Sequence, residues 1–263
     1  ASLTGASDGR GGAHGSPGWH CGGGGAYLSG THEGQDLTLP PTSLHAADEH
    51  SAPGTTFRWQ AAYPGPAQSR RLRAGVLHRL ATRNPLFVGL MAGLQSLLGY
   101  LSLAGRPQLI VASAVMALAM AGFIRRGGGR GPVATTLGAA HGLAHVALAY
   151  GLARVVDGAA ALVVVPLAGG AAATLLFAAY LFASSLAGIH DNEVFSAQSI
   201  EDHKSFLRLE LGPDHLTLHP VAVPRVCHRW TVSPESHGPW LQPTTPLRAR
   251  LAEPPCRISR RPA

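Results

Sequence analysis

The sequence predicts a mainly α-helical, polytopic membrane protein with about four transmembrane helices, a small β-hairpin and irregular Gly/Pro-rich termini. Two observations predict this fold class. Of the 263 residues, 46% are hydrophobic and only 13% are charged. This composition excludes a coiled coil, a charge-rich disordered protein and an ordinary soluble enzyme, in which polar and charged residues are spread evenly along the chain. Between Asn84 and Ile189, histidines aside, the charged residues fall in a few short clusters: Arg106, Arg125, Arg126, Arg130, Arg154 and Asp157.

These clusters leave four apolar segments, which are the expected transmembrane helices of a region covering residues 84–189. Because a helix rises ~1.5 Å per residue, each segment is long enough to cross the ~30 Å hydrocarbon core, the second at the short limit. Backbone polar groups in lipid must be satisfied within the segment, which requires helices. Buried helices of a soluble core are disfavoured, because such helices carry a polar stripe. The four segments are 86–104, 108–124, 133–153 and 160–187.

Small residues recur at a spacing of four within these segments. Examples are Gly89 and Gly93, Ala117 and Ala121, and Ala168 and Ala172. Small side chains let helix backbones approach closely in lipid, where packing rather than hydrophobicity holds helices together. The pattern therefore supports helix packing without identifying which helices meet.

Arginine placement predicts the orientation. Arginines are frequent before the first segment and in the loop between the second and third, and sparse in the other two loops. Because basic residues concentrate in cytoplasmic loops, we expect a multi-pass protein of the cell membrane with both termini in the cytoplasm and the lipid bilayer as partner. The arginines within 70–83 also fit a nucleic-acid patch, but they lack interleaved aromatic residues. No nucleic-acid partner is expected.

The N-terminal segment, residues 1–83, is rich in Gly and Pro. Its first twenty residues are poor in apolar side chains and offer no hydrophobic core. Four glycines precede Ala26, which predicts a strand within residues 21–32. The chain begins at Ala1 and its first methionine is Met91, so we expect a fragment or a processed product.

The C-terminal segment, residues 190–263, is expected to be cytoplasmic. Apolar residues alternate on both sides of the turn at Gly212, which predicts a β-hairpin over residues 206–223. Prolines from Pro224 onward exclude regular helix and predict an extended tail. A hairpin is not stable alone, and the sequence does not indicate what covers it.

Two histidines are candidate metal ligands within the third segment. His141 and His145 lie four residues apart and therefore share one face of a helix. By helical rise they lie about 12 and 18 Å deep, and ionisable groups at such depth are functional candidates. The third segment supplies no carboxylate as a further ligand, so hydrogen bonding of neutral histidines between helices is the favoured interpretation.

A second group of candidate ligands follows the fourth segment: His190, Asp191 and Glu193. Metal binding there is one interpretation. The favoured one is a solvated acidic segment beside the nearby arginines, because the spacing matches no established metal motif.

The most specific local sequences lie outside the apolar segments. They resemble the end of the catalytic domain, and the region after the membrane helices, of bacterial calcineurin-like metallophosphoesterases, with actinobacterial members the most similar. The resemblance implies that the chain is the C-terminal, membrane-helix-containing part of such a protein. The sequences are CGGGGAYLSGTH (21–32), HDNEVFSAQSIEDHKSFLRLEL (190–211), LTLHPVAVPRV (216–226) and PLRARLAEPP (246–255).

The catalytic motifs of that family are missing. Its members hold two divalent metal ions with motifs that include Gly-Asp-x-x-Asp, Gly-Asn-His and Gly-His-x-His, and none of these three occurs in the chain. Because a two-metal site needs its carboxylates and imidazoles together, we expect no catalytic residue, no cofactor and no hydrolase activity in this chain. Two metals are expected only where a full catalytic domain is present, and a separate or upstream catalytic domain is the expected protein partner.

Two other functions remain as hypotheses. The first is a small transporter or channel that uses His141 and His145. The second is an active membrane-bound phosphoesterase whose catalytic half lies upstream, which in-frame metal motifs in the upstream genomic DNA would reveal.

Overall fold

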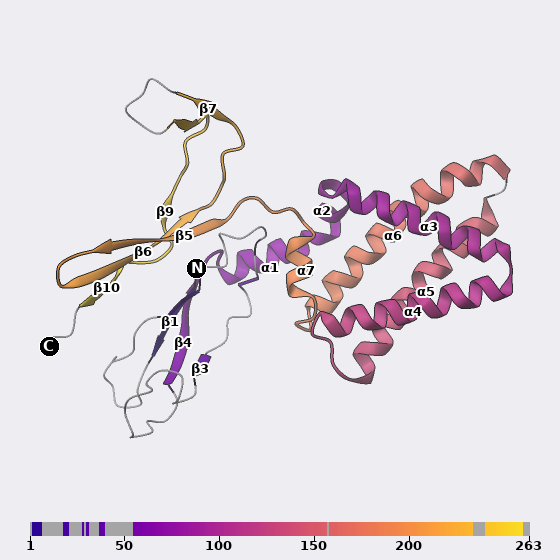
Figure 1. The fold of residues 1–263 in the computed structure, drawn as a ribbon, viewed down its shortest axis with the longest axis horizontal. Helices are drawn as coiled ribbons and strands as arrows, with labels where there is room; N and C mark the ends of the chain where they lie inside the picture. The colour runs from indigo at the N-terminus through magenta and orange to yellow at the C-terminus, as the bar shows by residue number, and fades with distance from the viewer. Residues whose placement is uncertain are drawn as a thin grey trace. The chain divides into compact units, whose positions relative to one another are not determined.

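The computed structural model describes residues 62–156, 158–233 and 240–259, with residues 28, 30 and 31 and the backbone of strands at 2–6, 18–20, 37–39 and 55–61. This part of the chain is mainly helical and forms two compact units, shown in Figure 1. One unit is Arg71–Ser199, and the other joins Ala1–Arg70 to Ile200–Ala263. The first boundary therefore falls inside helix α1 (Pro66–Ala74), whereas the sequence analysis placed it after residue 83.

The Arg71–Ser199 unit is a bundle of four long helices with shorter helices at one end (Figure 1). The four long helices match the four apolar segments to within a few residues. Helix α3 contacts the other three long helices, and α4 and α6 each pack on α5. The helices are α2 (Val76–Arg83), α3 (Pro85–Ala104), α4 (Arg106–Arg126), α5 (Gly131–Val155), α6 (Ala161–Ser185) and α7 (Asp191–Ser196), with a short 3₁₀ turn at Gly158–Ala160 before α6.

Three of the long helices are long and apolar enough to cross a membrane. They are α3, α4 and the continuous segment Gly158–Ser185 that contains α6. The third predicted segment forms α5, which is 25 residues long but is not among the three. Its two histidines and several glycines lower its hydropathy below that of its neighbours.

Glycines bring α4 against α5. An added Cβ at Gly138 would lie 2.5 Å from the carbonyl oxygen of Met120, and one at Gly142 would overlap that of Met116. A side chain at either position would therefore separate the two backbones.

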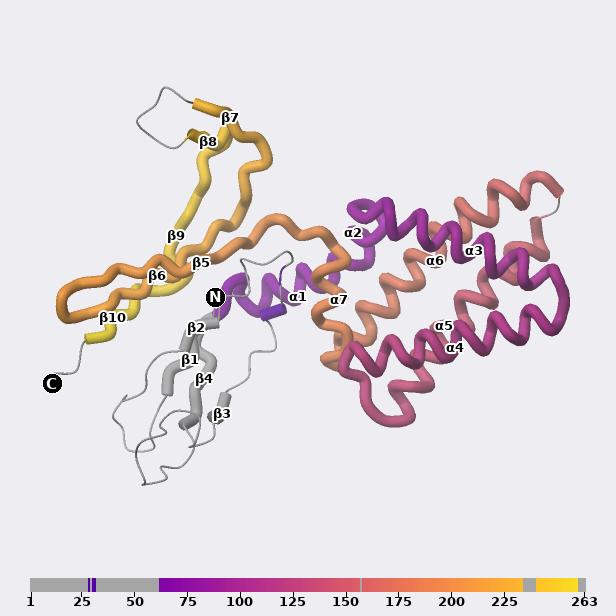
Figure 2. The backbone as a smooth tube through the Cα atoms, viewed as in Figure 1, coloured from indigo at the N-terminus to yellow at the C-terminus, as the bar shows by residue number. Residues whose placement is uncertain are grey.

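Helices α3 and α6 meet in the same way. A Cβ at Gly170 of α6 would lie 2.8 Å from Cα of Ala92, and one at Gly169 would lie 3.2 Å from the side chain of Gln95. The bundle thus contains two close helix pairs, α3 with α6 and α4 with α5. Helix α3 leads into α4 through the single residue Gly105, and Figure 2 shows the turn between these two helices at one end of the bundle.

The bundle exposes large apolar side chains on its surface and buries polar side chains in its interior. Leu86, Leu118 and Leu162 are 86%, 74% and 81% exposed. Polar side chains such as Gln95 and Thr174 are fully buried. Soluble proteins place these two kinds of residue the other way round.

The other unit contains short antiparallel sheets. The predicted hairpin is present as β5 (Lys204–Leu211) and β6 (His215–Val223), which pair along their full length. The tail itself covers the hairpin edge, because β9 (Arg250–Leu251) and β10 (Cys256–Ser259) both pair with β6. Strands β7 (Trp230–Val232) and β8 (Leu241–Pro243) pair with each other.

The N-terminal part of this unit forms a second sheet in the order β2-β1-β4-β3. Strand β4 lies in the Gly/Pro-rich N-terminal segment, for which the sequence predicted irregular or extended structure. The strand predicted within 21–32 lies largely outside the described residues. The strands are β1 (Ser2–Ala6), β2 (Gly18–His20), β3 (Leu37–Leu39) and β4 (Thr55–Ala62).

Candidate functional site

The two histidines of α5 point into the bundle and contact each other. His145 Nε2 lies 3.2 Å from His141 Nε2, so one nitrogen donates a hydrogen bond and the other accepts it. Both side chains are buried. The sequence analysis favoured hydrogen bonding of these histidines between helices, whereas this contact between the two imidazoles lies within α5.

Gln95 of α3 extends the contact on the other side of His145. Its Nε2 lies 3.5 Å from His145 Nδ1 and donates to the backbone carbonyl of His145 at 3.4 Å. Its Oε1 is buried without a hydrogen-bond partner among the described residues. A polar contact therefore links α3 to α5 near the middle of both helices.

Tyr180 of α6 extends the contact in the opposite direction. Its ring stacks on His141 with centroids 4.1 Å apart and planes 13° apart. Its hydroxyl lies 3.0 Å from Nε2 of His190, just beyond α6. We call the five side chains that make this series of contacts the polar line: Gln95, His145, His141, Tyr180 and His190.

His190 ties the end of the polar line to α4. Its imidazole is fully buried and stacks on Phe123 with centroids 4.1 Å and planes 19° apart. Its backbone N–H donates to the carbonyl of Gly127 at 2.8 Å. The residue adopts a left-handed conformation with φ of 64°, which turns the chain from α6 into α7.

The charge state of His190 follows from its surroundings. Burial lowers the pKa of His190 below its ordinary value of 6.5, and the carboxylate of Glu193 opposes this shift in part. Glu193 Oε1 lies 3.6 Å from His190 Nδ1, too far for a hydrogen bond. His190 is therefore neutral at neutral pH.

The predicted metal ligands do not form a chelating group. The structure joins His141, His145 and His190 through Tyr180, and places Asp191 and Glu193 in the first turn of α7. Across the part of the chain that the structure describes, no group of three or more His, Cys, Asp or Glu side chains is arranged to hold a metal ion.

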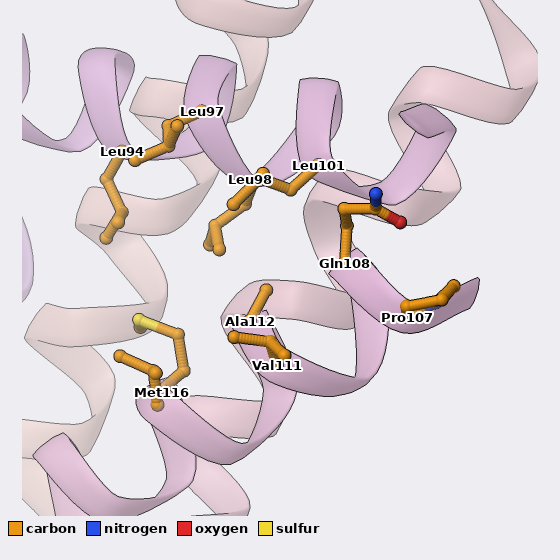
Figure 3. Close-up of a pocket in the computed structure, with 10 residues that line it drawn as sticks. Leu94, Leu97, Leu98, Leu101, Pro107, Gln108, Val111, Ala112 and Met116 are labelled. Carbon is orange, nitrogen blue, oxygen red and sulfur yellow. The ribbon is translucent and has the colours of Figure 1, made fainter. Parts of the chain in front are cut away.

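A second feature of the unit is an apolar crevice between α3 and α4, drawn in Figure 3. It has a volume of about 450 Å³. Its walls are aliphatic except for the Gln108 amide. Helix α3 contributes Leu94, Leu97, Leu98 and Leu101, and α4 contributes Pro107, Gln108, Val111, Ala112, Val115 and Met116.

The chain was compared with known proteins at three levels. No protein-family model, curated protein or solved structure matches it. Its function must therefore be argued from its own residues.

Sequence reasoning identified three members of the polar line and missed the other two. Gln95 carries the one side-chain amide of its apolar segment, and this signal could have identified it. Tyr180 and its neighbour Phe123 give no such signal, because an aromatic residue in a long apolar helix is ordinary. Gly127 is one of three successive glycines, Gly127–Gly129, in an arginine-rich turn.

Proposed function

We propose that this chain is an integral membrane protein in which α3, α4, α5 and α6 all span the bilayer, with both termini in the cytoplasm. It acts as a membrane anchor or scaffold, resembles the C-terminal part of a metallophosphoesterase, and has no hydrolase activity of its own. The observation that carries the proposal is the reversed polarity of the bundle. Exposed leucines on α3, α4 and α6 suit hydrocarbon, and the buried Gln95, His141 and His145 suit an interior shielded from it.

The case for α5 as a fourth span rests on its length and its partners. Its 25 residues reach about 37 Å by helical rise, and it packs along α4. The histidines that lower its hydropathy face inward and hydrogen-bond, which reduces the cost of placing them at membrane depth. A helix packed beside a spanning helix of similar length crosses the same layer.

Cysteine accessibility in intact cells tests this topology. In a background with Cys21, Cys227 and Cys256 changed to Ser, single Arg130→Cys and Arg154→Cys variants mark the two ends of α5. We expect a membrane-impermeant maleimide to label Arg154→Cys in intact cells and Arg130→Cys only after lysis. Equal labelling of both positions would show that α5 does not span.

Alkaline carbonate extraction tests membrane insertion itself. We expect the protein to stay in the membrane pellet, because the exposed leucines have a favourable transfer free energy into lipid. Release into the supernatant as a compact monomer would overturn the whole proposal.

The absence of hydrolysis is tested separately with purified protein. With bis-p-nitrophenyl phosphate and Mn²⁺, we expect no turnover above buffer. Turnover that a chelator abolishes would contradict the proposal and favour an active phosphoesterase.

The polar line favours a second candidate function, a small transporter or channel for protons or zinc. Imidazole and phenol groups in contact can exchange protons, and such groups inside a membrane mark ion pathways in pumps and transporters. Proteoliposome flux that is lost in a His141→Ala, His145→Ala variant would support it. Absence of flux, or flux that survives both substitutions, would contradict it.

A further inference from the structure

We propose that the crevice between α3 and α4 binds one acyl chain of a bilayer phospholipid, and that Arg106 binds the phosphate of its headgroup. This inference rests on the proposed membrane location. It adds a lipid-binding site, with a defined ligand chemistry, to a bundle otherwise described as an anchor.

The crevice follows from how the helices pair. Glycines draw α4 onto α5 and α3 onto α6, so the close contacts of α3 and α4 are made with other helices. Helix α3 leads into α4 through the turn at Gly105, where φ of 145° favours glycine. Helix α3 ends and α4 begins at this turn, and a crevice lined by side chains of both helices remains between them.

The walls of this space suit a hydrocarbon chain. From Gln108 to Met116 the crevice extends about 12 Å along α4 by helical rise. Leu97, Val111 and Val115 at its mouth are 55%, 61% and 58% exposed, so the crevice opens on the side that faces lipid under the proposed topology. An acyl chain restores dispersion contacts that the wall side chains lack when the space is unfilled.

The polar groups lie at one end only. Figure 3 shows the Gln108 side chain beside Pro107, at the end of the crevice near the turn. Arg106 precedes Pro107 and is exposed, and it forms no ion pair or hydrogen bond with any residue that the structure describes. Arg106 is adjacent in the chain to Pro107, which lines this end of the crevice, and a guanidinium binds phosphate through two parallel hydrogen bonds. This matches the charge and polarity of a phospholipid.

Native mass spectrometry of the detergent-purified full chain with added palmitoyl-oleoyl phosphatidylglycerol tests the proposal. We expect wild-type protein to retain one lipid per chain. Val115→Trp places an indole at the mouth and should weaken binding at least tenfold. Leu118→Trp is the matched control, because Leu118 is exposed on the same helix but does not line the crevice, and it should bind like wild type.

Arg106→Gln tests the headgroup contact. It should weaken binding of phosphatidylglycerol about fivefold, because one charge-assisted contact is lost, and should leave binding of uncharged diacylglycerol unchanged. Equal weakening for both lipids would overturn the role of Arg106.

Three further outcomes would overturn the site. Equal lipid retention by Val115→Trp and Leu118→Trp would show adventitious lipid only. A dimer that Val115→Trp abolishes would show that a second copy of the chain fills the crevice. A protein that resists carbonate extraction but binds no lipid would refute the crevice alone, whereas carbonate release would refute the membrane location itself.

Discussion

The imidazole of His190 occupies the space beside Gly127 where any other residue would carry its side chain. A Cβ built on Gly127 would overlap the His190 ring. The two residues are also joined through the backbone, since His190 N–H donates to the Gly127 carbonyl. The end of α4 and the turn after α6 are therefore shaped to fit each other.

Gly127→Ala should destabilise the bundle. The backbone at Gly127, with φ of −76° and ψ of 10°, is one that alanine adopts readily, so the cost comes from displacing the His190 ring. Overpacking of this kind costs roughly 1–3 kcal/mol, which thermal unfolding in detergent by circular dichroism will detect. Gly122→Ala on the same helix has open space around it and should not lower the unfolding temperature.

A double-mutant cycle isolates the Gly127–His190 contact. With His190→Ala in place the ring is gone, so adding Gly127→Ala should cost little. The two single changes should therefore sum to more destabilisation than the double variant shows. Strict additivity would show that the crowding at Gly127 has another source.

The stability of the bundle should fall in mild acid because of His190. Burial lowers its pKa in the fold, so below pH 6.5 the unfolded chain takes up the proton before the folded chain does. The contribution of His190 is complete above pH 6.5 and is lost as the pH falls toward the folded pKa. Tyr180 and Glu193 are the titratable side chains nearest this ring, and His141 interacts with it electrostatically.

The measurement is the unfolding temperature of wild type and His190→Gln from pH 7.5 to pH 5. Between pH 7.5 and pH 5 the unfolding temperature of wild type should fall further than that of His190→Gln, because the glutamine side chain cannot take up the proton. The other histidines are present in both proteins, so their contributions cancel in the comparison. Parallel curves would refute the assignment to His190.

Gly142→Ala should separate α4 from α5. Its Cβ meets the Met116 carbonyl, which is backbone and cannot rotate away, so the unfolding temperature should fall. Gly151→Ala on the same helix meets nothing within 4 Å and should raise stability by about 0.5–1 kcal/mol, as a helical Gly→Ala change does. A fall of equal size in both variants would argue against a specific α4–α5 contact.

Arg73→Met should loosen the packing of α1 against α6. Arg73 is buried, and its Nη1 donates to the carbonyl of Ser185 at 3.1 Å, in the last turn of α6. Loss of a hydrogen bond from a charged donor costs about 1.5–3 kcal/mol. The neighbouring Arg71 is exposed, so Arg71→Met is the control and should leave unfolding unchanged.

The positions of the four long helices could be predicted from the sequence, because an apolar run of sufficient length defines its own ends. Segment 86–104 became α3 with one added residue, and 133–153 became α5 with two added at each end. The hairpin could be predicted for a similar local reason, since alternation and a turn residue suffice.

The helix contacts could not be predicted, because small residues are too common in this chain to be selective. Gly89 and Gly93 have the expected spacing, yet nothing lies within 4 Å of a Cβ at either. The contact is made instead by Gly138 and Gly142. The contact of Gly138 and Gly142 with α4 fixes the rotation of α5 about its axis, and this rotation brings His141 against Tyr180. The sequence of one segment alone does not determine this rotation.

The pairing of α3 with α6 has a consequence for biogenesis. Helices emerge from the ribosome in chain order, so α4 and α5 can associate as soon as α5 has been made. Helix α3 is the first long helix made, but it can form its close contact with Gly169 and Gly170 only after α6, the last long helix, is made. The final long helix therefore completes the bundle, and substitutions at Gly169 or Gly170 should leave nascent chains that lack the close α3–α6 contact and are open to quality-control proteases.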